Sequence, residues 1–448
     1  MTPCLSFPRW IPRFIVKFVV PGLMIALVAF LAACGGATSP SSSSSTSSGP
    51  VTLTFWTWVP NVQSEVNLFE QSHPNIKIKV VNAGQGAPEY TKLRTALKAG
   101  SGGPDIVQIE FQYLPTFELT GDLVDLSQYG ANSIKNDYVP WTWSQVTQGS
   151  KVYAIPQDSG PMGLLYRKDI FDQYHLAVPQ TWAQYAQEAV ALHKANPKIY
   201  MTDFPLGDPG WFNGLLWQAG SRPFKVNGTN VSVNINDPAA LQVANYWGNL
   251  INQKAVQTAP DFTTDWYTGL AKGTYATWVT AAWGPVFLSG VAAQSAGKWR
   301  AAPLPQWTAG GQASANWGGS TDAVTTQSKH PKEATEFAMW LNHDQNSAKM
   351  FAQQQFLFPT LEGVLNDPSF INAPSSFYGG QQVNQVFASA SGNVDTSFQW
   401  SPFQDYVYTQ MTNQLSVAIN GKSTFEQAMN NLQSSVVTYA KNQGFTVG

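Results

Sequence analysis

Alternation between strand-like and helix-like hydrophobic patterns along residues 51–109 constrains the fold more than any other feature of the sequence. Residues 51–58 and 76–80 alternate between apolar and polar side chains, and residues 105–109 form a third apolar segment, so three strands are predicted. The two stretches between them have helical spacing, and the second helix is predicted over residues 90–99. Strands that alternate with helices in this way predict βαβ units and an α/β fold with a mainly parallel sheet covered by helices on both faces.

Later parts of the chain show the same kinds of signal. Thr181 and Gln184 have the spacing of a capping box that opens a helix, and Asp237-Pro238 has the residue order favoured at the start of another. Residues 332–341 and the C-terminal segment also have helical periodicity, with a break at Asn420-Gly421. Because 448 residues exceed one ordinary compact core, two lobes with a cleft between them are expected.

Charge and aromatic content narrow the range of partners. Only 12% of the residues are charged and the formal net charge is -2, so the chain offers no electrostatic footprint for nucleic acid. The sequence contains 17 Trp, 16 Tyr and 25 Phe. These side chains fill cores but also line sites that hold flat apolar faces, and their number alone leaves both interpretations open.

The N-terminal segment has the features of a secretory signal. An apolar run over residues 14–33 follows basic residues and ends at Cys34. Leu31-Ala32-Ala33-Cys34 resembles a lipobox, so residues 1–33 are predicted to be a cleaved signal peptide and Cys34 a lipidated mature N-terminus. The alternative is an uncleaved transmembrane anchor, because the run is nearly long enough to span a bilayer. Both interpretations place the globular part outside the cytoplasm.

Residues 34–50 are predicted to be a tether that begins with the lipidated cysteine. The segment is rich in Ser, Thr, Gly and Pro and has too little apolar surface to offset the entropy of ordering. Because Cys4 would leave with the signal peptide and Cys34 would carry lipid, the folded body would have no thiol for a disulfide, a metal site or a nucleophile.

Seven short motifs carry a family resemblance over residues 51–448. In chain order they are Leu53-Thr54-Phe55-Trp56, Gly103-Pro104-Asp105-Ile106-Val107, Lys151-Val152-Tyr153-Ala154-Ile155-Pro156, Leu165-Tyr166-Arg167-Lys168-Asp169, Ala282-Trp283-Gly284-Pro285, Trp317-Gly318-Gly319-Ser320 and Pro331-Lys332-Glu333-Ala334. Each is weak alone, but their order, the lipobox and the Ser-rich tether together resemble the extracellular solute-binding proteins of ABC importers. The resemblance is to family 1, the branch that includes maltose and multiple-sugar binding proteins.

The resemblance implies a two-lobed periplasmic-binding-protein fold in which each lobe has a mainly parallel sheet flanked by helices. Three hinge crossings would join the lobes near Pro156, Ser320 and Phe358-Pro359. Lobe one would comprise residues 51–156 and 320–356, and lobe two residues 157–319 and 357–448.

The resemblance also implies a function. Such a lipoprotein captures a sugar or oligosaccharide between its lobes by hinge closure and delivers it to the transmembrane subunits of an ABC permease. It would be a monomer without enzymatic activity, cofactor or metal, held by its lipid on the extracellular face of the cell membrane.

Sugar recognition requires flat aromatic surfaces for C–H faces and fixed carboxylates and amides for hydroxyls. Trp58 lies just past the first predicted strand, and Glu110 and Gln112 lie just past the third, at the ends of strands where open parallel sheets bind ligands. A carboxylate directly after an apolar strand is costly unless it is exposed or paired, and the family often has a sugar ligand in this loop. Packing inside a lobe is the alternative role of Trp58.

Two further candidates follow from positions near the first crossing and in the middle of the chain. The family often has an acid where Asp158 stands, although a helix cap or a hinge salt bridge is an alternative role for this residue. Asp208-Pro209-Gly210-Trp211 matches in position a turn that carries an acid and an aromatic residue in maltose-type members. The local sequence around Asp208 differs from the family's turn, so Trp211 is the expected site residue.

Three more tryptophans complete the predicted site. Trp283 precedes Gly284-Pro285 in a loop, and the family commonly has a stacking aromatic residue at this position. Trp317 lies beside the second predicted crossing, and Trp400 lies just before the C-terminal helices.

Two alternative functions remain open. A secreted glycoside hydrolase would also use tryptophans, with two carboxylates about 5 to 10 Å apart, and Glu110 and Asp158 are the candidates for that pair. The same fold could instead bind a non-sugar solute, although an anion site requires Arg or a helix N-terminus and a polyamine site requires more acids than the sequence offers. The five histidines have no metal-binding spacing and no serine stands in a nucleophile motif.

Overall fold

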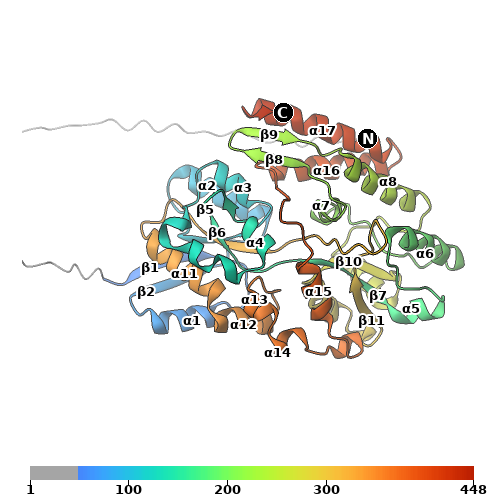
Figure 1. Cartoon of the computed structure of the whole chain (residues 1–448), viewed down its shortest axis with the longest axis horizontal. Helices are drawn as coiled ribbons and strands as arrows, with labels where there is room; N and C mark the ends of the chain where they lie inside the picture. The colour runs from blue at the N-terminus through green and yellow to red at the C-terminus, as the bar shows by residue number, and fades with distance from the viewer. Residues whose placement is uncertain (1–48) are drawn as a thin grey trace, which may run out of the picture. The chain divides into compact units, whose positions relative to one another are not determined.

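The computed structural model describes residues 49–448, which fold around two main sheets (Figure 1). The predicted signal peptide, Cys34 and nearly all of the predicted tether lie outside the described residues. The first sheet has the strand order β2-β1-β3-β12-β6. Its strands are β1 Val51–Trp56, β2 Ile76–Val81, β3 Ile106–Glu110, β6 Ala154–Pro156 and β12 Ser320–Val324.

The first sheet is mixed. β1 pairs in parallel with β2 and β3, whereas β12 runs antiparallel to both β3 and β6. The three strands and two helices predicted for residues 51–109 are confirmed, and Leu53 and Phe55 of β1 point into the core as the alternating pattern requires. The helices associated with this sheet are α1 Gln63–Ser72, α2 Ala87–Ala99, α3 Leu114–Leu119, α4 Pro140–Ser144, α11 Pro331–His343 and α12 Gln345–Gln354.

The second sheet corrects the expectation of mainly parallel sheets. It consists of β7 Met162–Arg167, β10 Thr277–Ala281 and β11 Trp299–Pro303. The order is β10-β7-β11, and both pairs are antiparallel. Every residue of β10 is buried, and a strand covered on both faces has a continuous buried run whichever way its neighbours point. The hydrophobic pattern therefore predicts that these strands are buried, but it does not predict whether they pair in parallel or antiparallel.

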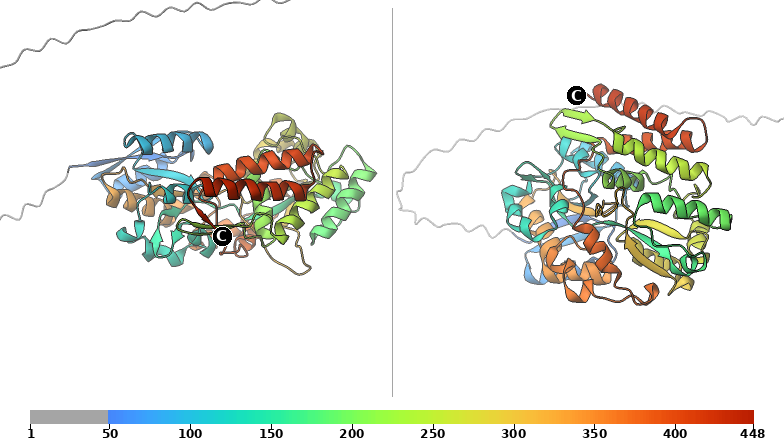
Figure 2. Two further views of the ribbon diagram at one scale, coloured as in Figure 1. Left: turned by 90° about the horizontal axis from the view of Figure 1, so that it is seen from above. Right: turned by 45° about the vertical axis from the view of Figure 1, so that its right-hand side comes forward.

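Helices surround the second sheet and extend beyond it. They are α5 Lys168–Gln173, α6 Trp182–Ala195, α7 Pro209–Gln218, α8 Pro238–Asn252, α9 Thr264–Lys272, α10 Gly284–Val291, α15 Val383–Ser391, α16 Gln404–Ile419 and α17 Phe425–Asn442. α17 packs against both α16 and α8, as the views in Figure 1 and Figure 2 show. The predicted capping box of Thr181 and Gln184, the cap of α8 by Asp237, and the break at Asn420-Gly421 are confirmed.

The remaining elements are short. They are β4 Thr147–Gln148, β5 Lys151–Val152, β8 Phe224–Asn227, β9 Asn230–Val233, β13 Thr446–Val447, α13 Glu362–Leu365, α14 Pro368–Ile371 and the 3-10 turns η1 Leu126–Tyr129, η2 Ala131–Asp137, η3 Ala293–Ser295 and η4 Ser376–Tyr378. β8 and β9 form a hairpin, and β13 pairs in parallel with β9. Within residues 49–448 no helix is both long and apolar enough to cross a membrane.

Three connecting segments lie side by side. Residues 157–161 lead from β6 to β7, residues 304–319 lead from β11 to β12, and residues 355–361 follow α12. The Trp317 N–H donates to the Gly160 carbonyl at 2.8 Å, and the Ser159 N–H donates to the Phe358 carbonyl at 3.0 Å.

This packing depends on glycine at one position. A Cβ atom at Gly160 would lie 2.0 Å from the Trp317 carbonyl oxygen, which no side chain allows. The connecting segments therefore approach each other closely at backbone level.

Candidate functional site

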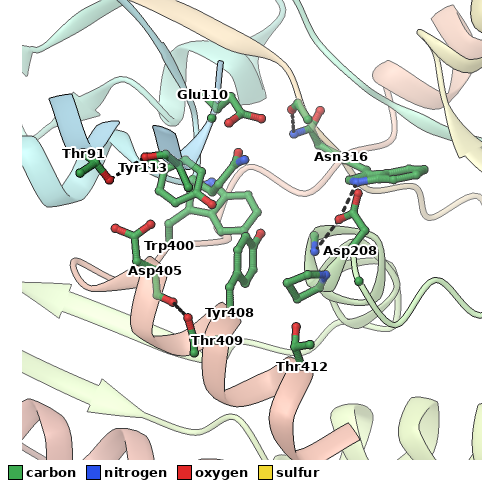
Figure 3. A pocket seen from close by; sticks show the side chains of 18 of the residues that line it. Thr91, Glu110, Tyr113, Asp208, Asn316, Trp400, Asp405, Tyr408, Thr409 and Thr412 are labelled. Carbon is green, nitrogen blue, oxygen red and sulfur yellow. Dashed lines mark hydrogen bonds between the residues drawn. The ribbon is translucent and has the colours of Figure 1, made fainter. Parts of the chain in front are cut away.

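A cavity of about 930 Å³, the central cavity, lies where elements associated with both sheets meet (Figure 3). The N-terminal part of α2 and the end of β3 contribute from the first sheet, whereas α7 and α16 contribute from the other side. The segment before β12 and Trp400 complete the wall. Four of the residues predicted for the site line this cavity, and they are Glu110, Gln112, Trp317 and Trp400.

Glu110 is the last residue of β3 and points its carboxylate into the cavity (Figure 3). The Tyr90 hydroxyl donates to Glu110 Oε2 at 3.1 Å, and the Glu110 N–H donates to the Tyr90 hydroxyl at 2.9 Å, which fixes the acid against α2. Enclosure raises the pKa of Glu110 to about 7, since loss of water outweighs the hydrogen bonds and the negative charges of Asp208 and Asp158 add to the effect. The group therefore changes its charge near neutral pH.

Asp208 is the second carboxylate of the wall. It is the N-cap of α7, and its Oδ1 accepts from the Gly210 N–H at 3.0 Å, from the Trp211 N–H at 3.3 Å and from Trp317 Nε1 at 3.3 Å. Within residues 49–448 no donor is hydrogen-bonded to its Oδ2. Burial raises the pKa of this carboxyl and the three hydrogen bonds oppose that rise. Asp208 thus has one oxygen held by the protein and one available to a ligand.

Aromatic rings form much of the remaining wall. Trp400 is 6% exposed, and its ring centroid lies 5.0 Å from that of Phe398 in an edge-to-face arrangement. Tyr113, just past β3, and Tyr408, on α16, meet edge to face with centroids 6.3 Å apart. Such rings offer flat surfaces to the C–H faces of a ligand, and the tyrosines add hydroxyls.

One face of α16 lines the cavity with polar side chains. Asp405, Tyr408, Thr409 and Thr412 stand at positions i, i+3, i+4 and i+7 of the helix, so they share one side of it (Figure 3). Asp405 forms an ion pair with Arg94 of α2, which joins the two walls of the cavity.

Four predicted site residues do not line the cavity. Trp58 is half-buried, and its backbone N–H donates to Gln108 Oε1 at 3.1 Å. Asp158 is buried and accepts hydrogen bonds from the backbone and the side chain of Ser320, a contact between two of the predicted crossings that differs from both the helix cap and the hinge salt bridge named above. Burial raises the pKa of Asp158 to about 6.

Trp211 is a core residue. It is 1% exposed, its Nε1 donates to the Val279 carbonyl at 2.9 Å, and its ring packs edge to face on Trp247 at 5.0 Å. The preference for Trp211 over Asp208 is thus reversed by position: in the first turn of α7 the cap faces the cavity, and Trp211 points to the protein interior.

Trp283 is half-buried and contacts the lining residue Trp317. Its Nε1 donates to the Trp317 carbonyl at 3.0 Å, and the two rings meet edge to face at 4.7 Å. The expected stacking residue therefore contacts the lining tryptophan and does not itself line the cavity.

Sequence reasoning missed several lining residues, which are Arg94, Tyr113, Asn316, Asp405, Tyr408, Thr409 and Thr412. The residues of α16 had a detectable signal, because polar groups at positions i, i+3, i+4 and i+7 share a face of a predicted helix. Within residues 49–448 no group of three His, Cys, Asp or Glu side chains has the geometry to hold a metal ion.

Comparison of the sequence with known families and curated proteins gives consistent matches. The family model for bacterial extracellular solute-binding proteins matches residues 56–348. The arabinooligosaccharide-binding protein of Bacillus subtilis (strain 168) is 27% identical over 313 residues, which cover 65% of this chain and 69% of that protein. The lactose-binding protein of Rhizobium radiobacter is 26% identical over 363 residues, which cover 75% of this chain and 81% of that protein.

Solved structures share the fold along nearly the whole described part. The ABC transporter associated binding protein from B. animalis subsp. lactis Bl-04, in complex with β-1,6-galactobiose, is 32% identical with a TM-score of 0.77, covering 89% of this chain and 100% of that chain. The galacto-N-biose-/lacto-N-biose I-binding protein of Bifidobacterium longum, in complex with lacto-N-biose, is 27% identical with a TM-score of 0.79, covering 90% and 100%.

Proposed function

This chain belongs to the bacterial extracellular solute-binding protein family, and from that premise we propose that the central cavity holds a sugar of two or more units. The protein is a sugar- or oligosaccharide-binding component of an ABC transporter and is not an enzyme. Its relatives bind arabinooligosaccharides, lactose, β-1,6-galactobiose or lacto-N-biose according to their names.

One observation carries the proposal for the cavity. Glu110 from the first sheet and Asp208 from α7 enter the same cavity, whose wall also contains Trp317, Trp400 and Tyr408. Carboxylate oxygens accept hydrogen bonds from sugar hydroxyls, and the rings cover C–H faces. Since Arg94 and Asp405 pair with each other, the cavity has no unpaired cation that would select an anion.

Titration calorimetry tests the proposal directly. Purified protein should release or absorb heat with at least one of β-1,6-galactobiose, lacto-N-biose, lactose and arabinooligosaccharides, and Glu110→Gln should weaken that binding. The proposal would be contradicted if none of these sugars gave a heat of binding while a peptide or a polyamine did. Chromatography of the titrated sugar should recover it intact, because a hydrolase would release products.

We also propose that lobe one comprises residues 51–156 and 320–356, that lobe two comprises residues 157–319 and 357–448, and that the lobes close around the sugar. The adjacent segments 157–161, 304–319 and 355–361 support a hinge at this place. Small-angle scattering should show that the particle contracts when sugar is added. An unchanged radius of gyration at saturation would count against closure.

The remaining proposals concern location and partners. We propose that Cys34 carries lipid and anchors a monomer to the extracellular face of the membrane, where the protein delivers sugar to the permease subunits. The lipobox at Leu31-Ala32-Ala33-Cys34 supports the anchor. Cys34→Ser should remain unprocessed or leave the membrane fraction, and unchanged processing with membrane retention would refute the assignment.

A further inference from the structure

A second cavity, of about 550 Å³, adjoins the central cavity. Arg94 and Asp405 line both cavities, so their ion pair forms part of the wall between them. The second cavity lies between α3 on one side and α16 with the C-terminal end of α17 on the other. We call it the outer cavity.

The outer cavity contains an aromatic pair. The rings of Tyr406 and Tyr439 stack with centroids 3.8 Å apart and an interplanar angle of 11°, and Phe403 meets Tyr439 edge to face at 5.5 Å. Both tyrosines are half-buried. Neither phenol hydroxyl is hydrogen-bonded to any of residues 49–448, so both are available to a ligand.

Polar groups without charge accompany these rings. Thr116, Thr120, Thr229 and Gln443 contribute hydroxyls and an amide to the lining. The only charged residues of the lining are Arg94 and Asp405, which neutralise each other. Leu119, Pro402 and Phe445 add apolar surface to the rings. Apolar and aromatic patches next to uncharged polar groups fit a neutral ligand whose C–H patches alternate with hydroxyls.

We infer that the outer cavity is a subsite for the further units of an oligosaccharide whose first units occupy the central cavity. The inference rests on the proposed function, and it identifies the preferred substrate as an oligosaccharide longer than the central cavity holds. Because Arg94 and Asp405 line both cavities, the two cavities are adjacent at this pair, and a chain that extends past it meets the tyrosine pair. The two cavities together then determine which oligosaccharide length binds most tightly.

Affinity as a function of sugar length tests this subsite. Calorimetric titrations with β-1,6-galactooligosaccharides and with arabinooligosaccharides, each from two to five units, should show affinity that rises beyond the disaccharide in the series that binds. In Tyr406→Ala the disaccharide should bind within about twofold of wild type, whereas the tetramer and pentamer should bind about tenfold more weakly, a change of about 1.4 kcal/mol. Gln443→Ala, an exposed change that removes no ring, should produce a smaller loss with the same dependence on length.

Tyr129→Ala is the matched control, since Tyr129 lies at the end of η1 and lines neither cavity. It should leave the whole length series unchanged. The inference is overturned if affinity in the wild type is independent of length, or if Tyr406→Ala and Gln443→Ala both leave the longer sugars unaffected. Equal weakening of the disaccharide and the pentamer by both variants would also overturn it. Failure of the proposed function has a different signature, because then no sugar of any length binds the wild type.

Discussion

Trp317 and Asp208 are joined by a hydrogen bond of 3.3 Å from the indole Nε1 to Oδ1 of the carboxylate. The contact links the segment before β12 to the first turn of α7. Because the same oxygen also caps α7, a single carboxylate oxygen holds both a helix end and an aromatic ring of the cavity wall. A substitution of Asp208 can therefore change both sugar affinity and the stability of α7. The choice of the new residue separates the two effects.

Asp208→Asn should weaken sugar binding with little effect on folding. Asparagine caps a helix as well as aspartate does, but it lacks the charge that strengthens a hydrogen bond from a sugar hydroxyl. We expect about a tenfold loss of affinity by calorimetry and a melting temperature close to that of wild type. Asp208→Ala should lose the same affinity and, in addition, about 1 kcal/mol of stability.

Asp237→Asn controls for the cap itself. Asp237 is the N-cap of α8 and does not line the central cavity, so its substitution should leave sugar affinity unchanged. If Asp208→Asn also left affinity unchanged, Asp208 would have only its structural role.

Trp317→Ala should weaken sugar binding more than Trp283→Ala does. Trp317 lines the cavity, so its removal should cost on the order of 1 to 3 kcal/mol of binding free energy. Trp283 acts through Trp317, and Trp283→Phe, which keeps a ring but loses the 3.0 Å hydrogen bond, should have the smallest effect. A loss in Trp283→Ala as large as in Trp317→Ala would instead mean that Trp283 contacts the sugar directly, as the sequence predicted.

Sugar affinity should depend on pH through Glu110. Its pKa is raised to about 7, and the ionised form accepts two hydroxyl hydrogen bonds where the protonated form has lost acceptor capacity. Affinity should therefore be full above about pH 8 and fall as the pH decreases through about 7 to about 6. Calorimetry across this range should show the fall in wild type and a flatter profile in Glu110→Gln. Identical profiles in the two proteins would assign the titration to another group.

Stability should depend on pH through Glu89. This residue of α2 is 0% exposed, and among residues 49–448 neither of its carboxylate oxygens has a hydrogen-bond partner. Burial first, and then the negative charge of Glu110, raise its pKa to about 8. The folded state thus retains a proton that the unfolded state releases near the ordinary value of 4.5, so the free energy of unfolding contributed by this group falls between pH 4.5 and 8.

Glu89→Met removes the buried carboxyl and should gain stability relative to wild type as the pH rises. Urea denaturation at pH 5 and pH 8 measures the difference, which should be larger at pH 8. Glu426→Gln, on the exposed first turn of α17, should show no such pH dependence. A Glu89→Met difference that is the same at both pH values would show that Glu89 is not held protonated.

Local signals in the sequence predicted the elements well. Thr181 and Gln184 cap α6 as their spacing required, and the alternation of β1 follows from side chains that point to opposite faces. The directions of β10 and β11 were missed, because pairing direction depends on which distant strand arrives beside β7.

The site was predicted less completely for a related reason. Glu110 and Gln112 reach the cavity because a strand end fixes where its own next residues lie. Trp211 and Trp283 have the residue type of a sugar site, but residue type does not predict that Trp211 packs in the core or that Trp283 contacts Trp317. Tyr408 and Asp405 were missed because α16 reaches this cavity only through its packing among other helices.

The sequence by itself determined the α/β class, the capped starts of α6 and α8, the break between α16 and α17, and the carboxylate and amide at or just past the end of β3, because each of these depends on residues close together in the chain. Only the tertiary structure decided that Asp208 and Glu110 line the same cavity, that Trp283 contacts Trp317, and that Arg94 meets Asp405. Arg94 and Asp405 are 311 residues apart, and no local pattern specifies a contact at that separation. Such contacts form only when the packing of whole helices and sheets positions both partners, so they follow from the complete fold.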